Sequence, residues 1–335
     1  MLNGLFTMMI LSLLGMILIG GCSAAPQSPM YSTKISDRED FDALIIVGDT
    51  QRTSVWEFWR EQNDEERSAV LEKIALDNPA LVIHLGDVVF QGSSGKQWRR
   101  FDESAFRVRE AGIPLLPVPG NHDYYGNKKQ ALKNFFSRFP FPEKKTWSAL
   151  SFKDVGIILL DSNVKHLGKT DRDLQYDWYI RTLREFQEDP HIAIILVACH
   201  HAPYTNSKTV TDNKYVQEAF VKPFNETPKA KAFFSGHCHS YEHFVTGDRH
   251  FLVSGGGGGP RHTLKTGKKA RHRDMFQAGT KRPFHFCRVS PVPDGLCVDM
   301  ISYDKDHNSW TLGERFIIPK DITRRRNENE NAIRG

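Results

Sequence analysis

The chain has 335 residues, and its 45 Lys and Arg against 40 Asp and Glu give a formal net charge of +5. Hydrophobic residues at 39% and charged residues at 25% are ordinary for a globular protein, which excludes a disordered, collagenous or multi-span membrane chain. Five cysteines are too few for a disulfide scaffold. The mild basicity is compatible with an anionic partner but does not identify one.

The N-terminal segment has the composition of a targeting sequence. Residues 1–21 contain no Lys, Arg, Asp or Glu, and they end at Gly20-Gly21-Cys22, which resembles a bacterial lipobox. We interpret 1–21 as a lipoprotein signal peptide, Cys22 as the lipidation site and 22–40 as a tether. The usual positive charge before the apolar run is missing, so an uncleaved single-span anchor stays open. Either interpretation places the globular part outside the inner membrane, and the lipobox-like run predicts an extracytoplasmic, membrane-anchored bacterial lipoprotein, periplasmic or at the cell surface.

From residue 41 onward, short apolar runs alternate with longer segments of helical spacing. The runs predict strands, and the longer segments predict helices: strands at 43–47, 80–85, 115–118, 156–160 and 192–198, and helices at 63–77, 97–111, 127–138 and 173–187. Because the runs are almost continuously apolar, we expect both faces of the sheet to be covered. Alternation in 284–289 and 296–303 predicts a terminal hairpin. The pattern indicates one layered α/β domain over 41–319, followed by a polar tail, 320–335, that we expect to be disordered.

Five apolar runs end in side chains that can bind metals. The five segments are Gly48-Asp49-Thr50-Gln51, Gly86-Asp87-Val88-Val89-Phe90, Gly120-Asn121-His122-Asp123, Cys199-His200-His201 and Gly236-His237-Cys238-His239. Each alone is ordinary turn or helix-cap chemistry. Ligands of open α/β sheets bind beyond the carboxyl ends of strands, so we expect the five loops to converge. Their carboxylate, amide and imidazole groups suit Mn, Fe or Zn better than a soft thiolate site would.

In this order, G-D-x-x, G-D-V-V, G-N-H-D, a strand ending in His, and G-H-x-H resemble the calcineurin-like metallophosphoesterase superfamily. The stretch from Gly236 to Glu242 is also similar to purple acid phosphatases, and the whole similarity covers residues 49–259. The resemblance implies a two-sheet αββα sandwich with one catalytic domain. It also implies a binuclear centre of divalent or mixed-valence ions and a phosphate-ester small molecule as the substrate.

The resemblance further implies a role for each matching residue. Asp87 would bridge the ions, and each ion would have its own further ligands: Asp49 and His239 for the first, and Asn121, His200 and His237 for the second. Phosphate mono- or diesters would be hydrolysed by attack of a metal-bound hydroxide. His122 would act as the general acid. Asp123 either orients the His122 imidazole or serves only the turn.

The chain departs from the family pattern at two positions and is ambiguous at a third. Gln51 stands where most members have a ligating His, so it is either a weaker metal ligand or a residue that supports one. Phe90 replaces the metal-binding Tyr of purple acid phosphatases, so we expect no iron-tyrosinate chromophore. His200 and His201 compete for one ligand position. The spacing after Val197 favours His200, which leaves His201 to support a ligand or contact substrate.

Two cysteine pairs and two further segments remain to be interpreted. Cys199 and Cys238 are predicted as buried thiols, with a disulfide as the alternative. Cys287 and Cys297 would pair if they lie opposite each other in the hairpin. The run Gly255–Gly259 predicts backbone that passes close to the metals, where side chains would obstruct substrate.

Residues 261–283 contain eight Lys and Arg against one acidic residue, Asp274, a net charge of +7. This segment is either a solvated loop or a lid that attracts a phosphate-bearing substrate or an anionic membrane surface. It offers little aromatic surface for stacking bases, so we do not expect a nucleic acid as partner. The sequence therefore predicts a metal-dependent phosphoric ester hydrolase. The alternatives are a non-catalytic metal-binding lipoprotein, because of Gln51, and a nucleic-acid phosphodiesterase.

Overall fold

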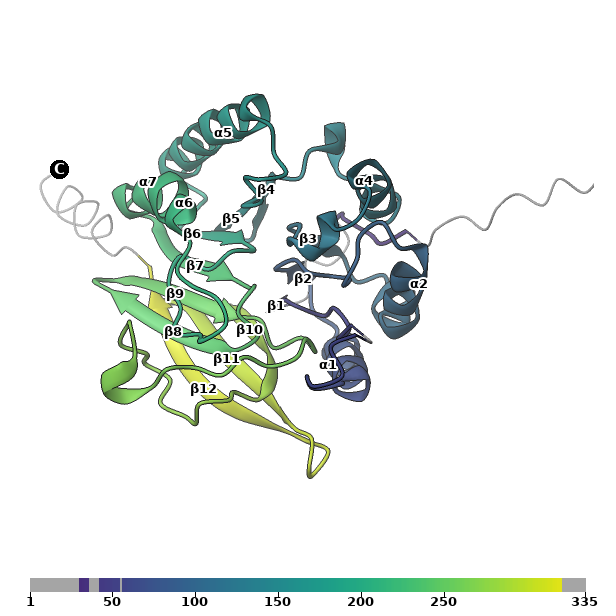
Figure 1. Ribbon diagram of the computed structural model, residues 1–335. Helices are drawn as coiled ribbons and strands as arrows, with labels where there is room; N and C mark the ends of the chain where they lie inside the picture. The colour runs from purple at the N-terminus through teal and green to yellow at the C-terminus, as the bar shows by residue number, and fades with distance from the viewer. Residues whose placement is uncertain (1–29, 36–41, 55, 321–335) are drawn as a thin grey trace, which may run out of the picture.

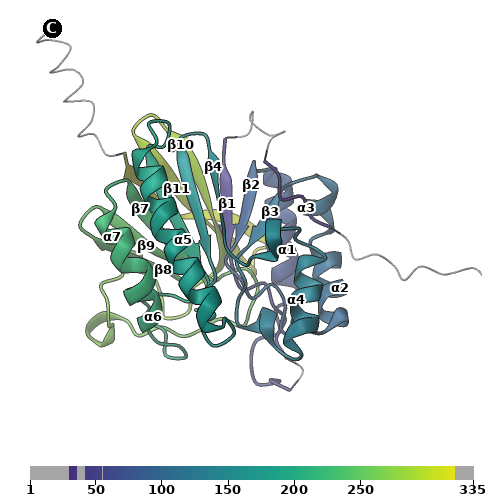
Figure 2. The same ribbon diagram turned by 90° about the horizontal axis from the view of Figure 1, so that it is seen from above.

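The computed structural model describes residues 30–35, 42–54 and 56–320. The predicted signal peptide, the lipidation site Cys22 and residues 321–335 of the predicted tail lie outside the described residues. Two six-stranded sheets stack against each other in the centre of the molecule, and helices cover their outer faces (Figures 1 and 2). This is the two-sheet α/β sandwich that the sequence predicts. No helix within the described residues is long and apolar enough to cross a bilayer.

The first sheet joins the N-terminal strands to the C-terminal hairpin. Its order is β12 (Ser309–Pro319), β11 (Gly295–Asp304), β10 (Phe284–Val292), β1 (Leu44–Val47), β2 (Leu81–His84) and β3 (Leu115–Pro117). Strands β1, β2 and β3 are parallel, while β10 runs antiparallel to β1. All four residues of β1 and of β2 are buried, as their continuous apolar sequences predict.

The second sheet has four parallel strands at its centre. Its order is β4 (Ser148–Phe152), β5 (Val155–Leu160), β6 (Ile194–Cys199), β7 (Ala230–Ser235), β9 (Arg249–Ser254) and β8 (Tyr241–Thr246). Strands β5, β6, β7 and β9 are parallel, and β4 and β8 close the two edges in antiparallel pairing. The sequence pattern does not predict β4 or β12, because most of their side chains are only partly buried or exposed.

Helices on the two outer faces come from separate halves of the chain. The first sheet is covered by α1 (Asp64–Asp77), α2 (Gly95–Ser104), α3 (Phe106–Glu110) and α4 (Lys128–Phe136), and the second by α5 (Lys169–Glu188), α6 (Lys214–Val216) and α7 (Lys222–Glu226) (Figure 2). A π-helical turn, Gln217–Val221, joins α6 to α7, and 3-10 turns span His122–Tyr124, Pro142–Lys144 and Gly267–Lys269. The helix predicted over 97–111 is two helices, interrupted at Ala105.

Part of the predicted tether belongs to the folded domain. Tyr31 is buried, and its ring stacks on Phe139 with the ring centroids 5.4 Å apart. Its backbone N–H donates to the Arg138 carbonyl at 2.9 Å. Within the predicted tether, Tyr31 therefore packs into the core, because an aromatic side chain in the polar stretch finds a place there.

The predicted disulfide between Cys287 and Cys297 does not form. The register of β10 and β11 pairs Cys287 with Met300 and Cys297 with Ser290, so the two cysteines are offset by three positions. An odd offset directs their side chains to opposite faces of the sheet. Cys199 and Cys238 are buried free thiols, as the first of the two interpretations predicts.

Candidate metal centre

The five donor-bearing loops converge at one end of the two sheets. They follow β1, β2 and β3 of the first sheet and β6 and β7 of the second. The donors that they bring together are Asp49 and Gln51, Asp87, Asn121, His200, and His237 and His239. Strands that run parallel within each sheet end at the same edge, which explains why segments distant in the sequence meet here.

Asp49, Asp87 and His239 form the first donor group. One ligand atom of each lies within 4.8 Å of the others, and all three side chains are buried. The His239 Nδ1–H donates to the Pro260 carbonyl at 2.9 Å, so Nε2 carries the free lone pair. This Nε2 lies 3.5 Å from Asp49 Oδ1. A carbonyl that fixes the ring in this way is the usual support of a metal-binding imidazole.

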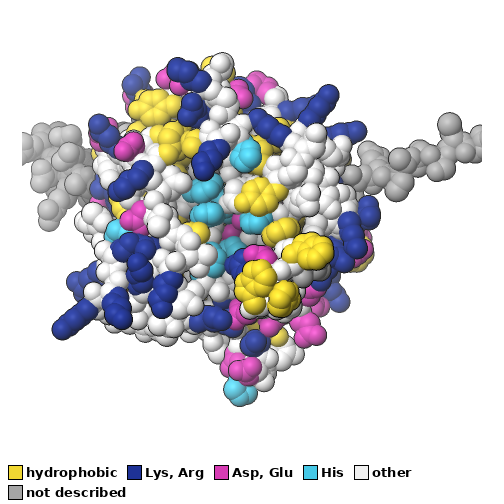
Figure 3. All heavy atoms as spheres, viewed as in Figure 1, with side chains coloured by type: hydrophobic (Ala, Val, Ile, Leu, Met, Phe, Trp, Pro, Cys, Tyr) yellow, Lys and Arg dark blue, Asp and Glu magenta, His cyan; other side chains and the backbone are white. Residues whose placement is uncertain are grey.

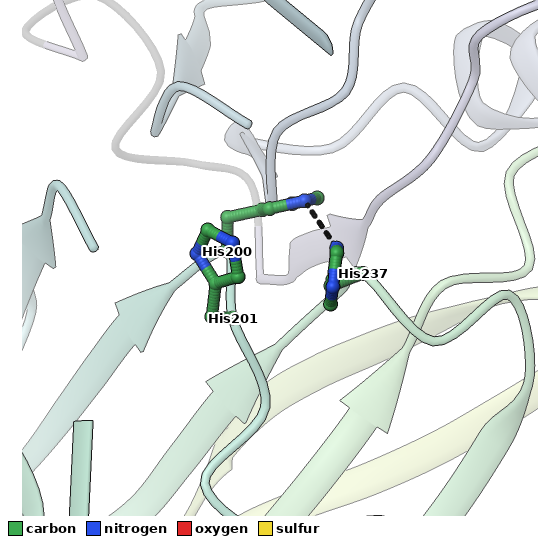
Figure 4. A group of neighbouring side chains, drawn as sticks. All are labelled: His200, His201 and His237. Atoms are coloured by element: carbon green, nitrogen blue, oxygen red, sulfur yellow. Dashed lines mark hydrogen bonds between the residues drawn. The ribbon is translucent and has the colours of Figure 1, made fainter. Parts of the chain in front are cut away.

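The second donor group is built on His200 and His237 (Figure 4). The His200 Nδ1–H donates to the Leu85 carbonyl at 2.8 Å, which leaves Nε2 for a ligand. This Nε2 lies 3.1 Å from Asn121 Oδ1, 3.1 Å from His237 Nδ1 and 3.4 Å from Asp87 Oδ1. His200 therefore faces the other predicted donors.

His201 occupies the border of this group. Its Nδ1 is 2.8 Å from the Ser162 hydroxyl, and its ring centroid lies 4.5 Å from that of His237. One ring nitrogen of His201 remains within 4.8 Å of the His200 and His237 donors. His200 therefore lies close to more of the predicted donors than His201, which stands at the border of the same group.

Three of the predicted ligands have a strained backbone. Asp49, Asp87 and His237 adopt φ angles of 61°, 53° and 64°, in the left-handed region. Such conformations cost of order 1–3 kcal/mol in non-glycine residues and persist where surrounding contacts hold them. The Asp49 N–H donates to the Gly86 carbonyl at 3.0 Å, and the His237 N–H donates to Asp49 Oδ2 at 3.0 Å. The loops therefore hold one another in the conformation that aims the ligands.

The chemistry of the donor set fits divalent metal ions. Burial raises the pKa of the Asp49 carboxyl well above its ordinary range, and the nearby Asp87 raises it further. Within the described residues, Asp49 and Asp87 have imidazole and amide groups beside them but no Lys or Arg in an ion pair. A cation would relieve this concentration of buried negative charge.

Gln51 adds an amide to the first group. Its Nε2 lies 3.2 Å from Asp87 Oδ2 and 2.9 Å from His239 Nε2. Its Oε1 is buried and has no hydrogen-bond partner among the described residues. Rotation of the amide by half a turn would place this oxygen among the first-group donors. Gln51 therefore lies where the resemblance places the ligating His of relatives, and its oxygen fits a metal ion.

His122 presents one ring nitrogen to the centre. Its Nδ1–H donates to the Phe90 carbonyl at 2.8 Å, while Nε2 lies 4.0 Å from Asp87 Oδ2. Asp123 does not orient this ring. Its carboxylate accepts from the backbone N–H groups of Gly120, Val89 and Val88 at 2.8, 3.2 and 3.3 Å. Of the two interpretations of Asp123, the turn role is therefore the correct one. Burial together with the Asp87 charge raises the Asp123 pKa to about 7.

Three residues around the centre follow no motif and were not predicted. The His262 ring stacks on His239 with the centroids 4.3 Å apart. The Tyr125 hydroxyl accepts from Asn121 Nδ2 at 3.0 Å. His84, which the sequence leaves without a role, bonds to the loop that carries Gln51. Of these three residues, only His84 has a sequence signal that could have identified it, because it is the last residue of the strand before a donor loop.

The glycine run passes close to the ligands for a reason other than the predicted one. A Cβ on Gly255 would lie 2.6 Å from Asp49 Oδ2, and a Cβ on Gly259 would lie 2.9 Å from His239 Nδ1. The Gly259 N–H donates to the Asp49 carbonyl at 2.7 Å. Side chains here would displace ligands of the first group, which is a tighter constraint than room for substrate.

Comparison with known proteins identifies the family. The sequence model of the calcineurin-like phosphoesterases matches residues 43–241, which contain every predicted ligand. The chain belongs to this family. Both donor groups that the structure brings together lie within the matched segment.

Two relatives show the range of the phosphoesterase family. The chain is 30% identical over 130 residues to a probable glycerophosphodiester phosphodiesterase of Arcobacter nitrofigilis, a match that covers 37% of this chain and 42% of the relative. It is 28% identical over 161 residues to purple acid phosphatase 1 of Ipomoea batatas, covering 43% and 31%. The matches thus span less than half of either relative.

Solved structures confirm the phosphoesterase fold. The purple acid phosphatase of yellow lupin (Lupinus luteus) seeds superposes with a TM-score of 0.65 at 16% identity, covering 84% of this chain and 54% of that one. GAP50, described as the anchor in the inner membrane complex of Plasmodium, gives a TM-score of 0.62 at 13% identity and covers 83% and 89%. At such low identities the likeness concerns the fold alone.

Proposed function

We propose that this protein is a binuclear metal-dependent phosphoesterase that hydrolyses phosphate mono- or diesters. The observation that carries the proposal is the position of Asp87 between the two donor groups. Its Oδ1 lies 3.4 Å from His200 Nε2, and its Oδ2 lies 3.2 Å from Gln51 Nε2. One carboxylate thus offers an oxygen to each group, as a bridging ligand must.

The predicted ligands divide between the two sites: Asp49, Gln51 and His239 at the first, and Asn121, His200 and His237 at the second, with Asp87 shared. Such oxygen and nitrogen donors suit Mn, Fe or Zn. When bound, two such ions supply Lewis acidity to the phosphoryl group and to the attacking water. Around them, the chain fixes the ligand rings through the carbonyls of Leu85 and Pro260.

His122 is the residue that would protonate the leaving oxygen. The Phe90 carbonyl holds a proton on Nδ1, so a second proton on the imidazolium resides at Nε2, the nitrogen that faces Asp87. The ring is held between Phe90 and Tyr125, with centroid distances of 4.8 and 4.4 Å. These contacts limit the directions in which His122 can turn.

The experiment reloads purified protein with Mn, Fe or Zn and measures bound metal together with hydrolysis of aryl phosphate mono- and diesters. His122→Ala should keep its metals and lose about 10²–10⁴-fold in turnover, the usual contribution of a general acid. Asp87→Asn should lower metal content as well as activity. Two bound metals without hydrolysis of either ester class would contradict the proposal and favour the non-catalytic alternative. Cleavage of oligonucleotides alone would favour the nucleic-acid phosphodiesterase.

We also propose that the domain is held at a membrane through a lipid on Cys22. The lipobox-like run Gly20-Gly21-Cys22 at the end of the apolar segment supports this proposal. Replacement Cys22→Ala should release the protein into the soluble fraction, or leave it unprocessed with its signal peptide. Continued labelling of Cys22→Ala by a radioactive fatty acid would contradict the assignment of this cysteine.

A further inference from the structure

A loop beside the metal centre exposes three large aromatic side chains. Trp56, Phe58 and Trp59 are 82%, 81% and 71% exposed, and we call residues 56–59 the aromatic loop. Single exposed hydrophobic residues are common on proteins, but a contiguous exposed patch of this kind marks an interaction surface. The Phe58 and Trp59 rings are in edge-to-face contact with their centroids 5.2 Å apart, and both side chains nevertheless stay largely exposed.

The exposure does not result from a loosely held chain. Arg60 forms an ion pair with Glu57 at 3.0 Å, which closes the loop. Glu61, next along the chain, pairs with Arg261 and with Lys281, each at 2.9 Å. Several ion pairs therefore hold the loop in a conformation that keeps the aromatic rings exposed to water.

The same contacts fix the aromatic loop beside the metal centre. Arg60 Nη2 donates to the Pro260 carbonyl at 3.4 Å and lies 3.5 Å from His262 Nε2. Pro260 and His262 in turn contact the His239 ring, the first through its carbonyl and the second by stacking. The aromatic loop is thus separated from a predicted ligand by one layer of residues.

The basic segment 261–283 begins at the centre, where the His262 N–H donates to the His239 carbonyl at 2.9 Å. Lys268, Lys269 and Arg273 are exposed and form no ion pair within the described residues. They belong to the segment 261–283, whose net charge is +7. Figure 3 shows histidine side chains in the middle of this face, with hydrophobic side chains to their lower right and Lys and Arg to their lower left.

We propose that this face docks on an anionic phospholipid bilayer, with the aromatic loop inserted among the headgroups and Lys268, Lys269 and Arg273 against the lipid phosphates. Tryptophan and other aromatic rings favour the bilayer interface, where the ring is apolar and its edge can meet polar groups. Clustered cations are attracted to anionic leaflets. A slot for one small aromatic ligand would bury most of each side chain, whereas Trp56, Phe58 and Trp59 are largely exposed. Docking in this orientation directs the metal centre toward the membrane surface.

The test uses the full chain and vesicles of phosphatidylcholine with phosphatidylglycerol that carry bromine on their acyl chains. Bromine quenches only those tryptophans that enter the bilayer, so association through the N-terminal segment does not imitate insertion of the loop. Trp fluorescence of the wild type should be quenched. The quenched component should be lost in Trp56→Phe/Trp59→Phe and kept in Trp310→Phe, whose ring packs on Tyr303 within the hairpin of β11 and β12.

Charge and surface controls complete the test. Lys268→Glu/Lys269→Glu and high salt should both reduce the quenching, because screening and charge reversal weaken attraction to an anionic surface. Leu76→Ser/Phe106→Ser changes an exposed apolar pair on α1 and α3 and should leave the quenching unchanged. Absence of quenching, or equal quenching with neutral vesicles, would overturn the proposal. None of these readouts depends on phosphoesterase activity, so failure of one proposal does not imply failure of the other.

Discussion

Gln51 illustrates how one side chain would set the properties of the proposed first metal site. Its buried Oε1 has no partner among the described residues, and its Nε2 meets the lone pair of His239. A buried acceptor without a hydrogen bond lowers the stability of the fold by about 1–3 kcal/mol. The unpaired oxygen of Gln51 therefore indicates a bound group, such as a metal ion, that this oxygen contacts. An amide oxygen is a weaker donor than an imidazole for these metals, so the first site should be the weaker one.

Replacement of Gln51 by His should therefore strengthen binding of the first metal, and Gln51→Ala should weaken it by about 10–100-fold, the usual effect of removing a residue that supports a metal site. Competition with a chelator measures the two affinities separately. Gln62→Ala, an exposed polar position in the same loop region, serves as the control. Unchanged affinity of both sites in Gln51→Ala would show that the amide neither binds nor supports the metal.

At the scale of elements, the donor loops depend on the ends of the strands that precede them. His84, the last residue of β2, accepts from the Gly86 N–H at 3.2 Å through Nδ1. Its Nε2–H donates to the Thr50 hydroxyl at 2.9 Å, and that hydroxyl donates to the Val88 carbonyl at 3.1 Å. One imidazole thus ties the loop after β1 to the loop after β2.

His84→Leu should loosen both loops, because it removes the acceptor of Gly86 and the donor to Thr50 while it keeps an apolar side chain. We expect metal affinity to fall by about 10–100-fold. Isothermal titration calorimetry on wild type and variant measures the change. His307→Leu, at the exposed turn between β11 and β12, is the matched control and should bind metal as the wild type does. Normal affinity in His84→Leu would refute the coupling of the loops.

The five strand-end loops could be predicted from sequence because each signal is local. An apolar run such as Leu81–His84 forms a buried strand. Gly86 and Asp87 follow it, and these residue types disfavour strands and favour turns. Strands β4 and β12 escape this reasoning, since their side chains are mixed in character and their stability comes from pairing with a neighbour. The break at Ala105 also has no clear local signal.

For the molecule as a whole, buried histidines should make stability depend on pH. Burial lowers the pKa of His285 to about 4 and that of His84 to about 3. The unfolded chain takes up these protons near pH 6.5, while the folded chain resists them. The stability contributed by the neutral rings is therefore fully present above pH 6.5 and is lost as the pH falls toward the folded pKa.

The prediction can be isolated at His285, whose Nε2 has no partner among the described residues. Between pH 7 and pH 5 the free energy of unfolding of the wild type should fall by about 2 kcal/mol more than that of His285→Phe. Urea unfolding of chelator-treated protein at the two pH values measures both changes, with the metals removed so that their release adds nothing. Equal pH dependence of the unfolding free energy in the two proteins would show that the buried His285 ring does not contribute to it.

The sequence by itself determined the α/β class, the order of the donor loops and most of the predicted ligands, since each depends on a strand and the few residues after it. Only the tertiary structure decided that His200 faces the other predicted donors, that Asp123 serves the turn and that the glycine run lies against Asp49 and His239. His200 faces the centre because its Nδ1 finds the Leu85 carbonyl, which lies 115 positions away in the chain. The register of β10 and β11, and the ion pairs that hold the aromatic loop outward, likewise depend on contacts between distant segments. Local patterns specify which side chains can bind, whereas long-range packing decides where each of them points.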